Sequence, residues 1–456
     1  MDPGLRPLSA RHARREEADP PARDRRAVDR WFHARSSAVR PHLRGRGQVS
    51  VRRGGWLIDL PRTASTIVVG GGVVGAASAY FLCDRGERDV LVLERDKLGS
   101  GTTKGGLGGI RHQFVDELDI RMSQLATAFW RNFEDRTGSR HDFEERGYLF
   151  IANTEEGVAQ LREPMPLYER MRAAVRMVSR VEIAELVPGI RTDDVFGGRF
   201  GARDGYGDPL GALAGFAAAA QLDGASFREG VAVESLLREG DRVTGVRTAS
   251  GDVGADRVLI ATGCWTAALA ATAAVPVPIW PYRRSIMQSG PVPELARVPL
   301  TIEWESGFHF RPKGAAQRFA MPNITTDGKE EKGPVGAPTA FPGDFAPLEV
   351  PPSLEPWLRA RAAWRHPAFA RLEIVDSWSC YYEMTPDDHP IVGAVPGVAG
   401  LYIAAGFSGH GFMHAPATAQ LVVEEMLDGR ARSIDIRDLS LERFQTGRRP
   451  FKAAVL

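Results

Sequence analysis

Cysteine and lysine are both scarce in this chain of 456 residues. The three cysteines, Cys83, Cys264 and Cys380, lie far apart in the sequence and form no C-x-x-C pair. This spacing argues against a disulfide framework and against a zinc site, and it fits a reducing compartment. Only six lysines are present, so arginine carries most of the positive charge. We therefore expect a cytoplasmic protein that holds no metal ion.

The sequence also lacks a long hydrophobic run suited to crossing a membrane. Its most apolar stretch, from Cys264 to Tyr282, contains three prolines, and proline disrupts helices. Basic and acidic residues number 58 and 57, and 43% of the residues are hydrophobic. This composition is that of a globular protein, and the balanced charge predicts neither nucleic acid nor an anionic membrane as a partner.

The first 62 residues contain little that could form a core. Arginine-rich runs such as Arg11 to Arg15 alternate there with acidic residues, without a sustained apolar period. We predict a disordered tail over residues 1–62. Acidic residues such as Glu16 and Glu17 disfavour a targeting peptide.

A glycine-rich turn gives the strongest motif. Gly70, Gly72 and Gly75 have the G-x-G-x-x-G spacing directly after a β-branched run. Gly70 permits the tight turn, Gly72 lets the backbone approach a pyrophosphate, and Gly75 lets the next helix pack on the sheet. That helix is predicted from Val73 to Asp84, and its first amides, on Val73 and Val74, would bind phosphate. The motif alone also occurs in methyltransferases and in plain strand-to-helix connections.

An acidic residue follows the second predicted strand. Glu94 comes directly after Asp89 to Leu93 and would accept hydrogen bonds from ribose hydroxyls, with Arg95 beside it. A carboxylate at this place repels a 2′-phosphate, so FAD or NAD is preferred over NADP.

Three later segments favour FAD. The loop from Gly99 to Gly109 is rich in Gly, Ser and Thr, and its backbone N–H groups could bind a second anionic stretch, although a merely flexible loop is an alternative. A strand ends in a small-residue turn at Ala261 to Gly263. Near the end, Gly406 to Phe412 precedes a helix predicted from about Pro416 to Leu427, whose N-terminus would polarise the pyrimidine edge of a flavin. From these segments we predict cofactor contacts at Ser100, Thr102, Gly109, Ala261, Gly263, Gly406, Ser408, Gly409, His410, Gly411 and Phe412.

Helical and strand patterns alternate along the rest of the chain. A helix is predicted from Thr154 to Met177, and strands from Gly147 to Ile151, Arg242 to Thr248 and Arg257 to Ile260. The segment from Pro322 to Pro352 is predicted to form long surface loops. The mixture indicates an α/β or α+β protein.

These motifs, with Gly108 to Phe114, Ala261 to Trp265 and Met384 to Asp387, resemble the D-amino-acid-oxidase-like FAD-dependent oxidoreductases. The branches concerned hold sarcosine oxidase, glycine oxidase, dimethylglycine dehydrogenase and a complex I assembly flavoprotein. The resemblance implies a Rossmann-like FAD-binding domain interleaved with an antiparallel-sheet substrate domain, and adds Val233 to the cofactor contacts. The expected FAD-binding domain comprises residues 63–141, 206–271 and 386–435, and the substrate domain residues 142–205 and 272–385.

The resemblance also implies a reaction. Hydride would leave the carbon beside the nitrogen of an amino acid or an N-methylated or secondary amine, and the resulting imine would hydrolyse. The electron acceptor is not identified, but dehydrogenase is slightly favoured over oxidase, because no lysine matches the one that oxidases of the family hold over the flavin; Arg318 is nearest. Met413 replaces the carboxylate-binding lysine of monomeric sarcosine oxidase. That departure motivates an alternative, a low-turnover FAD-binding assembly or scaffold protein.

Individual roles follow from the resemblance. Arg111 would bind the substrate carboxylate, with a structural salt bridge as the alternative. His112 and Tyr382 would line the substrate pocket, because imidazoles and aromatic rings can pack against a neutral amine and bind its carboxylate, with a structural role as the alternative for each. Cys380 stands nine residues before His389, the spacing at which monomeric sarcosine oxidases attach flavin covalently. Many relatives have glycine there, so noncovalent FAD is favoured and a link at Cys380 is the alternative.

Overall fold

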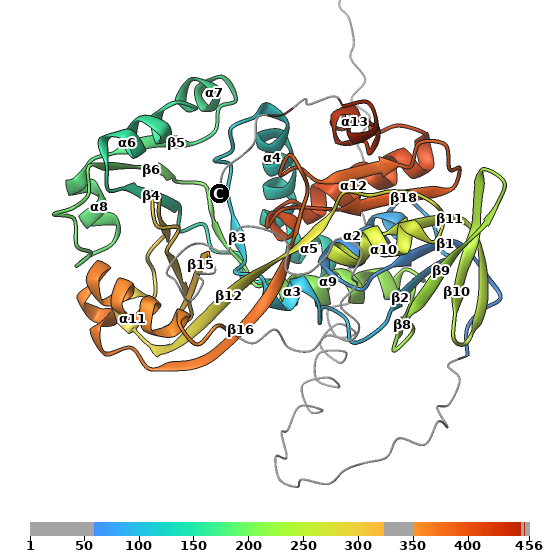
Figure 1. Ribbon diagram of the computed structural model, residues 1–456, viewed down its shortest axis with the longest axis horizontal. Helices are drawn as coiled ribbons and strands as arrows, with labels where there is room; N and C mark the ends of the chain where they lie inside the picture. Colours follow the sequence, from blue (N-terminus) through green and yellow to red (C-terminus); the bar gives the residue numbers. More distant parts are fainter. Residues whose placement is uncertain (1–58, 323–349, 448–450, 452–456) are drawn as a thin grey trace, which may run out of the picture.

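The computed structural model describes residues 59–322, 350–447 and 451 (Figure 1). The predicted tail before residue 59 and most of the predicted loop segment from Pro322 to Pro352 lie outside the described residues.

A mixed sheet carries the glycine motif. Strand β1 (Thr63–Val69) pairs in parallel with β2 (Val90–Glu94) on one side and with β11 (Gly251–Ile260) on the other. The runs Thr66 to Val69 of β1 and Val90 to Leu93 of β2 are buried without interruption, as expected for strands covered on both faces. The remaining strands of this sheet are β8 (Ser226–Glu229), β9 (Val233–Glu239), β10 (Arg242–Thr248), β17 (Ile391–Ala394) and β18 (Leu401–Ala405).

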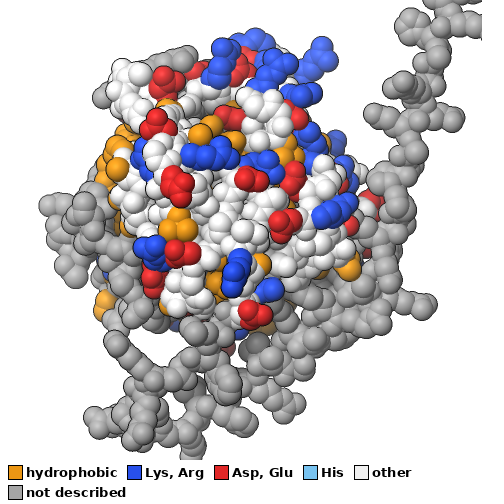
Figure 2. All heavy atoms as spheres, turned by 90° about the vertical axis from the view of Figure 1, so that its right-hand side faces the viewer, with side chains coloured by type: hydrophobic (Ala, Val, Ile, Leu, Met, Phe, Trp, Pro, Cys, Tyr) orange, Lys and Arg blue, Asp and Glu red, His pale blue; other side chains and the backbone are white. Residues whose placement is uncertain are grey.

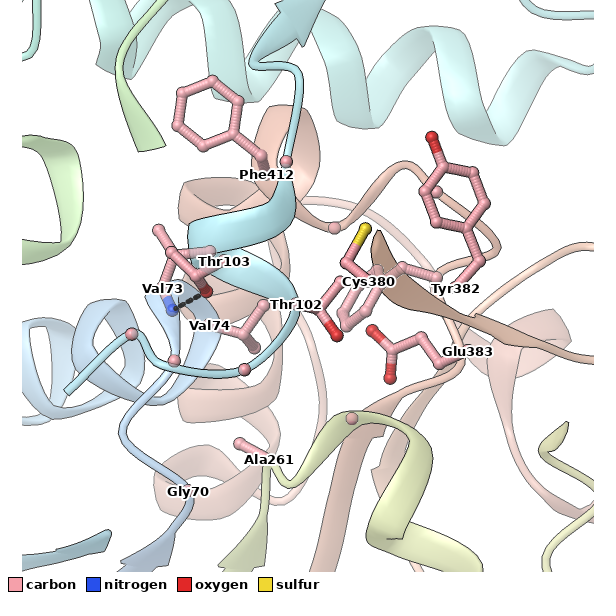
Figure 3. A pocket seen from close by; sticks show the side chains of 18 of the residues that line it. Gly70, Val73, Val74, Thr102, Thr103, Ala261, Cys380, Tyr382, Glu383 and Phe412 are labelled. Atoms are coloured by element: carbon pink, nitrogen blue, oxygen red, sulfur yellow. Dashed lines mark hydrogen bonds between the residues drawn. The ribbon is translucent and has the colours of Figure 1, made fainter. Parts of the chain in front are cut away.

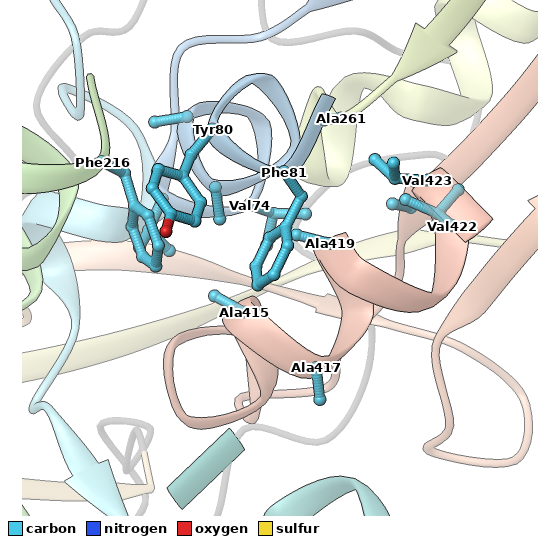
Figure 4. Close-up of a cluster of buried hydrophobic side chains, with 14 of the residues drawn as sticks. Val74, Tyr80, Phe81, Phe216, Ala261, Ala415, Ala417, Ala419, Val422 and Val423 are labelled. Atoms are coloured by element: carbon cyan, nitrogen blue, oxygen red, sulfur yellow. The ribbon is translucent and has the colours of Figure 1, made fainter. Parts of the chain in front are cut away.

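Three helices cover one face of this sheet. They are α2 (Val73–Asp84), α9 (Pro209–Leu222) and α12 (Gly411–Asp428). Helix α2 has the predicted bounds and is buried from Val73 to Cys83, because α9 and α12 enclose it. Tyr80 of α2 packs against Phe216 of α9, with 5.5 Å between ring centroids, and the alanines of α12 allow close approach (Figure 4). Each buried aromatic ring of this kind contributes about 1.5–3 kcal/mol.

The second sheet is almost entirely antiparallel. Its strand order is β16-β12-β15-β14-β13-β4-β6-β5, and only β13 and β4 run in parallel. The long strands β12 and β16 extend toward the first sheet (Figure 1). The strands are β4 (Tyr148–Ala152), β5 (Val175–Val178), β6 (Gly197–Gly201), β12 (Trp280–Pro291), β13 (Leu300–Glu303), β14 (His309–Lys313), β15 (Ala316–Pro322) and β16 (Ile374–Met384).

Most of the remaining elements are short. A two-stranded ribbon joins β3 (Gly109–Ile110) to β7 (Gly205–Tyr206). The helices are α3 (Thr102–Gly105), α4 (Glu117–Arg131), α5 (Phe133–Thr137), α6 (Glu155–Arg162), α7 (Met165–Arg170), α8 (Arg180–Leu186), α10 (Thr266–Ala271), α11 (Leu354–Arg365) and α13 (Glu442–Gln445).

The predicted helix from Thr154 to Met177 is wrong. The segment forms α6, α7 and then β5. Pro164 ends the first helix and begins the second, because proline has no N–H group to continue an α-helix. The predicted strand from Arg242 to Thr248 is confirmed by β10, and the strand at Gly147 to Ile151 by β4, one residue later.

The predicted fold class, a Rossmann-like part combined with a largely antiparallel sheet, is confirmed. Strands of the first sheet come from residues 63–94, 226–260 and 391–405, and those of the second from 148–201 and 280–384. The interleaved domain division stays a prediction.

Charges of both signs are mixed over one face of the molecule. Figure 2 looks onto the right-hand side of Figure 1, where lysine and arginine side chains lie beside aspartate and glutamate. In the described ranges, no helix combines the length and the apolar character needed to cross a membrane.

Candidate active site

A cavity of about 490 Å³ lies where the two sheets meet. The first sheet contributes the turns that follow β1, β11 and β18, and the second contributes β12 and β16 (Figure 3). The predicted cofactor residues that line it are Gly70, Gly72, Val73, Val74, Glu94, Arg95, Thr102, Gly109, Val233, Ala261, Gly263, Ser408, Gly409, His410, Gly411 and Phe412. Gly75, Ser100 and Gly406 are not among the lining residues.

The three glycines of the motif meet different surroundings. At Gly70, where φ is +109°, a Cβ atom would lie 2.4 Å from the carbonyl oxygen of Ala261. At Gly75 it would lie 2.0 Å from the carbonyl oxygen of Gly70. At Gly72 the nearest atom is Thr103 Oγ1 at 3.3 Å, so a Cβ atom there would require a shift of only a few tenths of an ångström. Chain packing therefore demands glycine at positions 70 and 75, whereas at Gly72 the space faces the cavity and fits a bound pyrophosphate.

The end of β2 presents a buried carboxylate. Glu94 accepts hydrogen bonds from the backbone N–H of Gly71 at 2.7 Å and of Asp96 at 2.9 Å. Burial raises the pKa of Glu94, and these backbone donors act against it. The side chain is thus fixed at the cavity wall, where its free lone pairs could accept ribose hydroxyls.

The glycine loop from Gly99 to Gly109 is held on both sides. Thr103 accepts a hydrogen bond from the Val73 N–H at 3.0 Å, which ties α3 to the start of α2 (Figure 3). Buried Arg311 donates to the carbonyl oxygens of Leu107 and Gly207. These hydrogen bonds give the loop a defined shape at the cavity wall. A merely flexible loop, the alternative interpretation, would not need them.

The last helix of the cavity begins earlier than predicted. Helix α12 starts at Gly411 and not near Pro416, because Pro416 removes one backbone hydrogen bond without ending the helix. Gly411, Phe412 and Met413, the first three residues of α12, therefore line the cavity. Helix N-termini attract negative partial charge, so this geometry suits an electron-rich edge of a flavin.

Arg111 is a buried guanidinium in the cavity wall, only 6% exposed. Its Nη2 lies 3.2 Å from His410 Nε2, and its Cζ lies 4.7 Å from the ring centroid of Phe114. Burial, with the charge of Arg111 next, lowers the pKa of His410 far below its ordinary value, so the neutral imidazole accepts the hydrogen bond. Within the described ranges Arg111 forms no ion pair, and its buried Nε has no hydrogen-bond partner. This arrangement leaves a positive charge ready for an anionic ligand.

The other two predicted catalytic residues differ in position. Tyr382 lines the cavity, and burial raises its pKa to about 12, so it stays a phenol. His112 is not among the lining residues. Its ring Nδ1 lies 2.7 Å from Asp204 Oδ1, and its backbone N–H also donates a hydrogen bond to that oxygen. The geometry favours a role for His112 in holding the backbone next to Arg111. Arg318 also lies off the cavity, with Nε donating to Gln288 Oε1 at 3.0 Å.

Cys380 lines the cavity next to α3. Its Sγ lies 3.5 Å from the carbonyl oxygen of Gly105. Burial raises the pKa of this thiol to about 12, so the thiolate is rare at neutral pH.

Several cavity residues were missed by sequence reasoning. Glu383 accepts a hydrogen bond from the Gly406 N–H at 3.0 Å, and burial raises its pKa to about 7. Arg284 and His309 come from β12 and β14, and Tyr148 from β4. Nothing in the sequence marks these residues, since their meeting depends on how the second sheet pairs.

A buried polar cluster outside the cavity joins three parts of the chain. His389 Nε2 lies 2.8 Å from Asp116 Oδ2 and 3.1 Å from Asp119 Oδ2, while Nδ1 lies 2.6 Å from the carbonyl oxygen of Asp387. With acceptors at both nitrogens, the imidazole is held as a cation. The ring stacks on Phe451, with 3.7 Å between centroids. Burial lowers the pKa of His389, but bonds to the two carboxylates outweigh it and raise the pKa to about 10.

We expect His389→Gln to destabilise the protein by about 3–5 kcal/mol below pH 6.5, since it leaves buried carboxylates without a cation. A pKa raised from 6.5 to about 10 in the folded state gives stabilisation that is complete below pH 6.5 and is lost as the pH rises through 10. Urea unfolding of both proteins at pH 6, 8 and 10 should show the difference shrinking. A difference independent of pH would contradict the ion pair.

Comparison with known proteins places this geometry in a family. A family model described as "FAD dependent oxidoreductase" matches residues 65–425. The 4-methylaminobutanoate oxidase (formaldehyde-forming) of Paenarthrobacter nicotinovorans is 30% identical over 84% of this chain and 46% of its own length. This chain therefore spans less than half of that relative. FAD-dependent oxidoreductase domain-containing protein 1 of Xenopus laevis is also 30% identical, over 84% of this chain and 83% of its own.

Solved structures give the same grouping. L-proline dehydrogenase from P. horikoshii superposes with a TM-score of 0.76 at 28% identity, over 85% of this chain and 99% of that one. Glycine oxidase from Geobacillus kaustophilus shares the fold, with a TM-score of 0.72 at 24% identity over 84% and 99%. The chain belongs to the D-amino-acid-oxidase (DAO) family of FAD-dependent oxidoreductases.

Proposed function

We propose that this protein oxidises the carbon–nitrogen bond of an amino acid whose nitrogen is secondary or N-methylated, giving an imine that hydrolyses. The observation that carries the proposal is Arg111, a buried guanidinium in the cavity wall with no ion-pair partner among the described residues. A guanidinium binds a carboxylate through two parallel hydrogen bonds. The names of two relatives support this class, since 4-methylaminobutanoate and L-proline each carry a carboxylate and a secondary amine.

The residues of this chain have distinct tasks in the proposal. Gly72, Glu94 and the first turn of α12 would hold FAD, which supplies the acceptor for the hydride. Arg111 fixes the carboxylate, and His410 orients the guanidinium by accepting its N–H. Burial lowers the pKa of His309 to about 4, so this imidazole is neutral at physiological pH and can accept a hydrogen bond from an amine.

We propose that FAD is bound noncovalently. The high pKa of Cys380 supports this, because a covalent thioether forms from a thiolate. Acid precipitation tests it: the yellow colour is expected in the supernatant. Colour that stays with the pellet of the wild-type protein, but not of Cys380→Ser, would establish the alternative link.

We propose a dehydrogenase rather than an oxidase. None of the described residues that line the cavity is a lysine, and Arg318 lies outside the lining. Slow reoxidation of the reduced flavin by air, with fast reoxidation by an artificial acceptor such as a quinone, is expected. The reverse order would identify an oxidase. The assembly or scaffold alternative is not favoured, because a scaffold has no need of a cavity with an unpaired buried guanidinium. A cytoplasmic location stays a prediction.

Anaerobic addition of substrate to the purified holoenzyme should bleach the flavin absorbance. We expect bleaching by secondary and N-methylated amino acids and not by the corresponding amines without a carboxylate, since only the former engage Arg111. Absorbance at 450 nm follows the reaction. Bleaching by carboxylate-free amines at equal rates would contradict the role of Arg111, and the absence of bleaching across the whole panel would contradict the proposed function.

A further inference from the structure

Three arginines line the cavity: Arg95, Arg111 and Arg284. Arg95 belongs to the dinucleotide end, where its Nε lies 3.4 Å from Asp96 Oδ2 and its guanidinium covers the ring of Trp265. Arg111 and Arg284 form no ion pair within the described residues. One substrate carboxylate would neutralise Arg111 and leave the second guanidinium without a counter-ion.

Arg284 comes from a different part of the fold. It lies on β12 opposite Cys380 of β16, and its Nη1 donates to the carbonyl oxygen of Arg283 at 3.0 Å. Its Cζ lies 5.3 Å from the ring centroid of Tyr382. The remaining N–H groups of this guanidinium donate to no acceptor within the described residues, so they can bind a ligand in the cavity.

The two guanidinium groups act on the same residues. Burial lowers the pKa of His309 most, and the positive charges of Arg111 and Arg284 lower it further. The same two charges oppose the rise in the pKa of Tyr382 that burial causes. Arg111, Arg284, His309 and Tyr382 all line the same cavity, so the two guanidinium groups act on one chamber.

The wall of that chamber also has an apolar part. Ile286, Ile302 and Ala320 line it, from β12, β13 and β15. A cavity with two unpaired cations and an apolar wall suits a ligand with two anionic ends joined by a short carbon chain. The phosphates of the dinucleotide would not neutralise these two arginines, because they would bind at the glycine turn and the N-terminus of α2.

We infer that the substrate is a secondary or N-methylated amino acid with two carboxylates, one bound by Arg111 and the other by Arg284. This inference rests on the proposed function and narrows its substrate class. The redox step is unchanged: bound FAD would supply the acceptor for the hydride from the C–H bond beside nitrogen, the N–H proton would pass to solvent, and water would hydrolyse the C=N bond to a carbonyl compound and an amine. The second carboxylate takes no part in bond breaking, so Arg284 is a specificity-determining residue.

The test compares matched substrates on the holoenzyme. N-methylaspartate, N-methylglutamate and iminodiacetate are compared with N-methylalanine and N-methylglycine, using kcat/KM for anaerobic flavin reduction. We expect the dicarboxylates to be preferred by about 100-fold, since close charge pairs between binding partners are worth about 1.5–7 kcal/mol. Arg284→Met should reduce this preference to less than about threefold. Arg318→Met removes the same charge from neighbouring β15 outside the cavity lining, and it should keep the preference.

A binding measurement separates this inference from the proposed function. Succinate and glutarate, which cannot be oxidised, should perturb the flavin spectrum of the wild-type holoenzyme at lower concentrations than acetate or butyrate, and Arg284→Met should abolish that difference. Equal use of mono- and dicarboxylates, or an unchanged preference in Arg284→Met, would overturn the inference while the proposed function stands. Dicarboxylate binding without flavin reduction by any amine would overturn the proposed function instead.

Discussion

Replacement of Arg111 by methionine is expected to lower kcat/KM by about 100- to 1,000-fold, mainly through KM. Removing one partner of a buried, hydrogen-bonded charge pair costs about 2–5 kcal/mol, and each 1.4 kcal/mol corresponds to about a factor of ten. The substrate carboxylate would lose the two N–H groups that fix it, and His410 would lose the donor that now lies 3.2 Å away. Stopped-flow reduction of the flavin at several substrate concentrations separates KM from the rate of hydride transfer.

Arg111→Lys serves as the matched variant. It keeps the positive charge but lacks the planar fork, so we expect an intermediate loss. Thermal unfolding must accompany both measurements, because Arg111 also packs on Phe114 and near Tyr148. If Arg111 has only a structural role, its replacement would lower the melting temperature and leave KM near the wild-type value. That result would show that Arg111 does not bind the substrate carboxylate.

Gly72→Ala is expected to weaken FAD binding while the protein stays folded. The added methyl group would meet its nearest neighbour, Thr103 Oγ1, at 3.3 Å, and it would project where the pyrophosphate is proposed to lie. Forcing a methyl group into a filled site costs about 1–3 kcal/mol, which is about a tenfold to hundredfold loss of affinity. The dissociation constant for FAD, measured by quenching of flavin fluorescence with the apoprotein, checks this.

Gly75→Ala is the control, and we expect it to lower the stability of the folded protein and not only the affinity for FAD. Its methyl group would lie 2.0 Å from the carbonyl oxygen of Gly70, so α2 cannot keep its place on β1. We expect a lower melting temperature even without FAD. If Gly72→Ala instead lowers the stability of the apoprotein as much as Gly75→Ala does, the space beside Gly72 belongs to the chain and not to the cofactor.

The sequence alone determined the parts of this protein that depend on local physics. The glycine spacing at 70, 72 and 75, the buried strand before it and Glu94 after the next strand predict a dinucleotide site, because each residue acts within one βαβ unit. The bounds of α2 followed from the same local pattern. The Gly406 to Phe412 turn was recognised because it joins a strand to a helix, whereas Arg111 was identified through the family resemblance.

Only the tertiary structure decided which distant residues complete the cavity. Arg284 lies opposite Cys380 because β12 pairs with β16 in one register, and a shift of one residue would turn its side chain to the other face of the sheet. The position of His309 likewise depends on the register of β14. His112 lies outside the cavity lining and is hydrogen-bonded to Asp204, which is 92 positions later in the sequence. Strand register and long-range hydrogen bonds are set by the packing of the whole molecule, which a local pattern does not contain. The glycine turn, Glu94 and Arg111 could therefore be predicted from the sequence to line one cavity, whereas Arg284, the second charge proposed to select the substrate, could not.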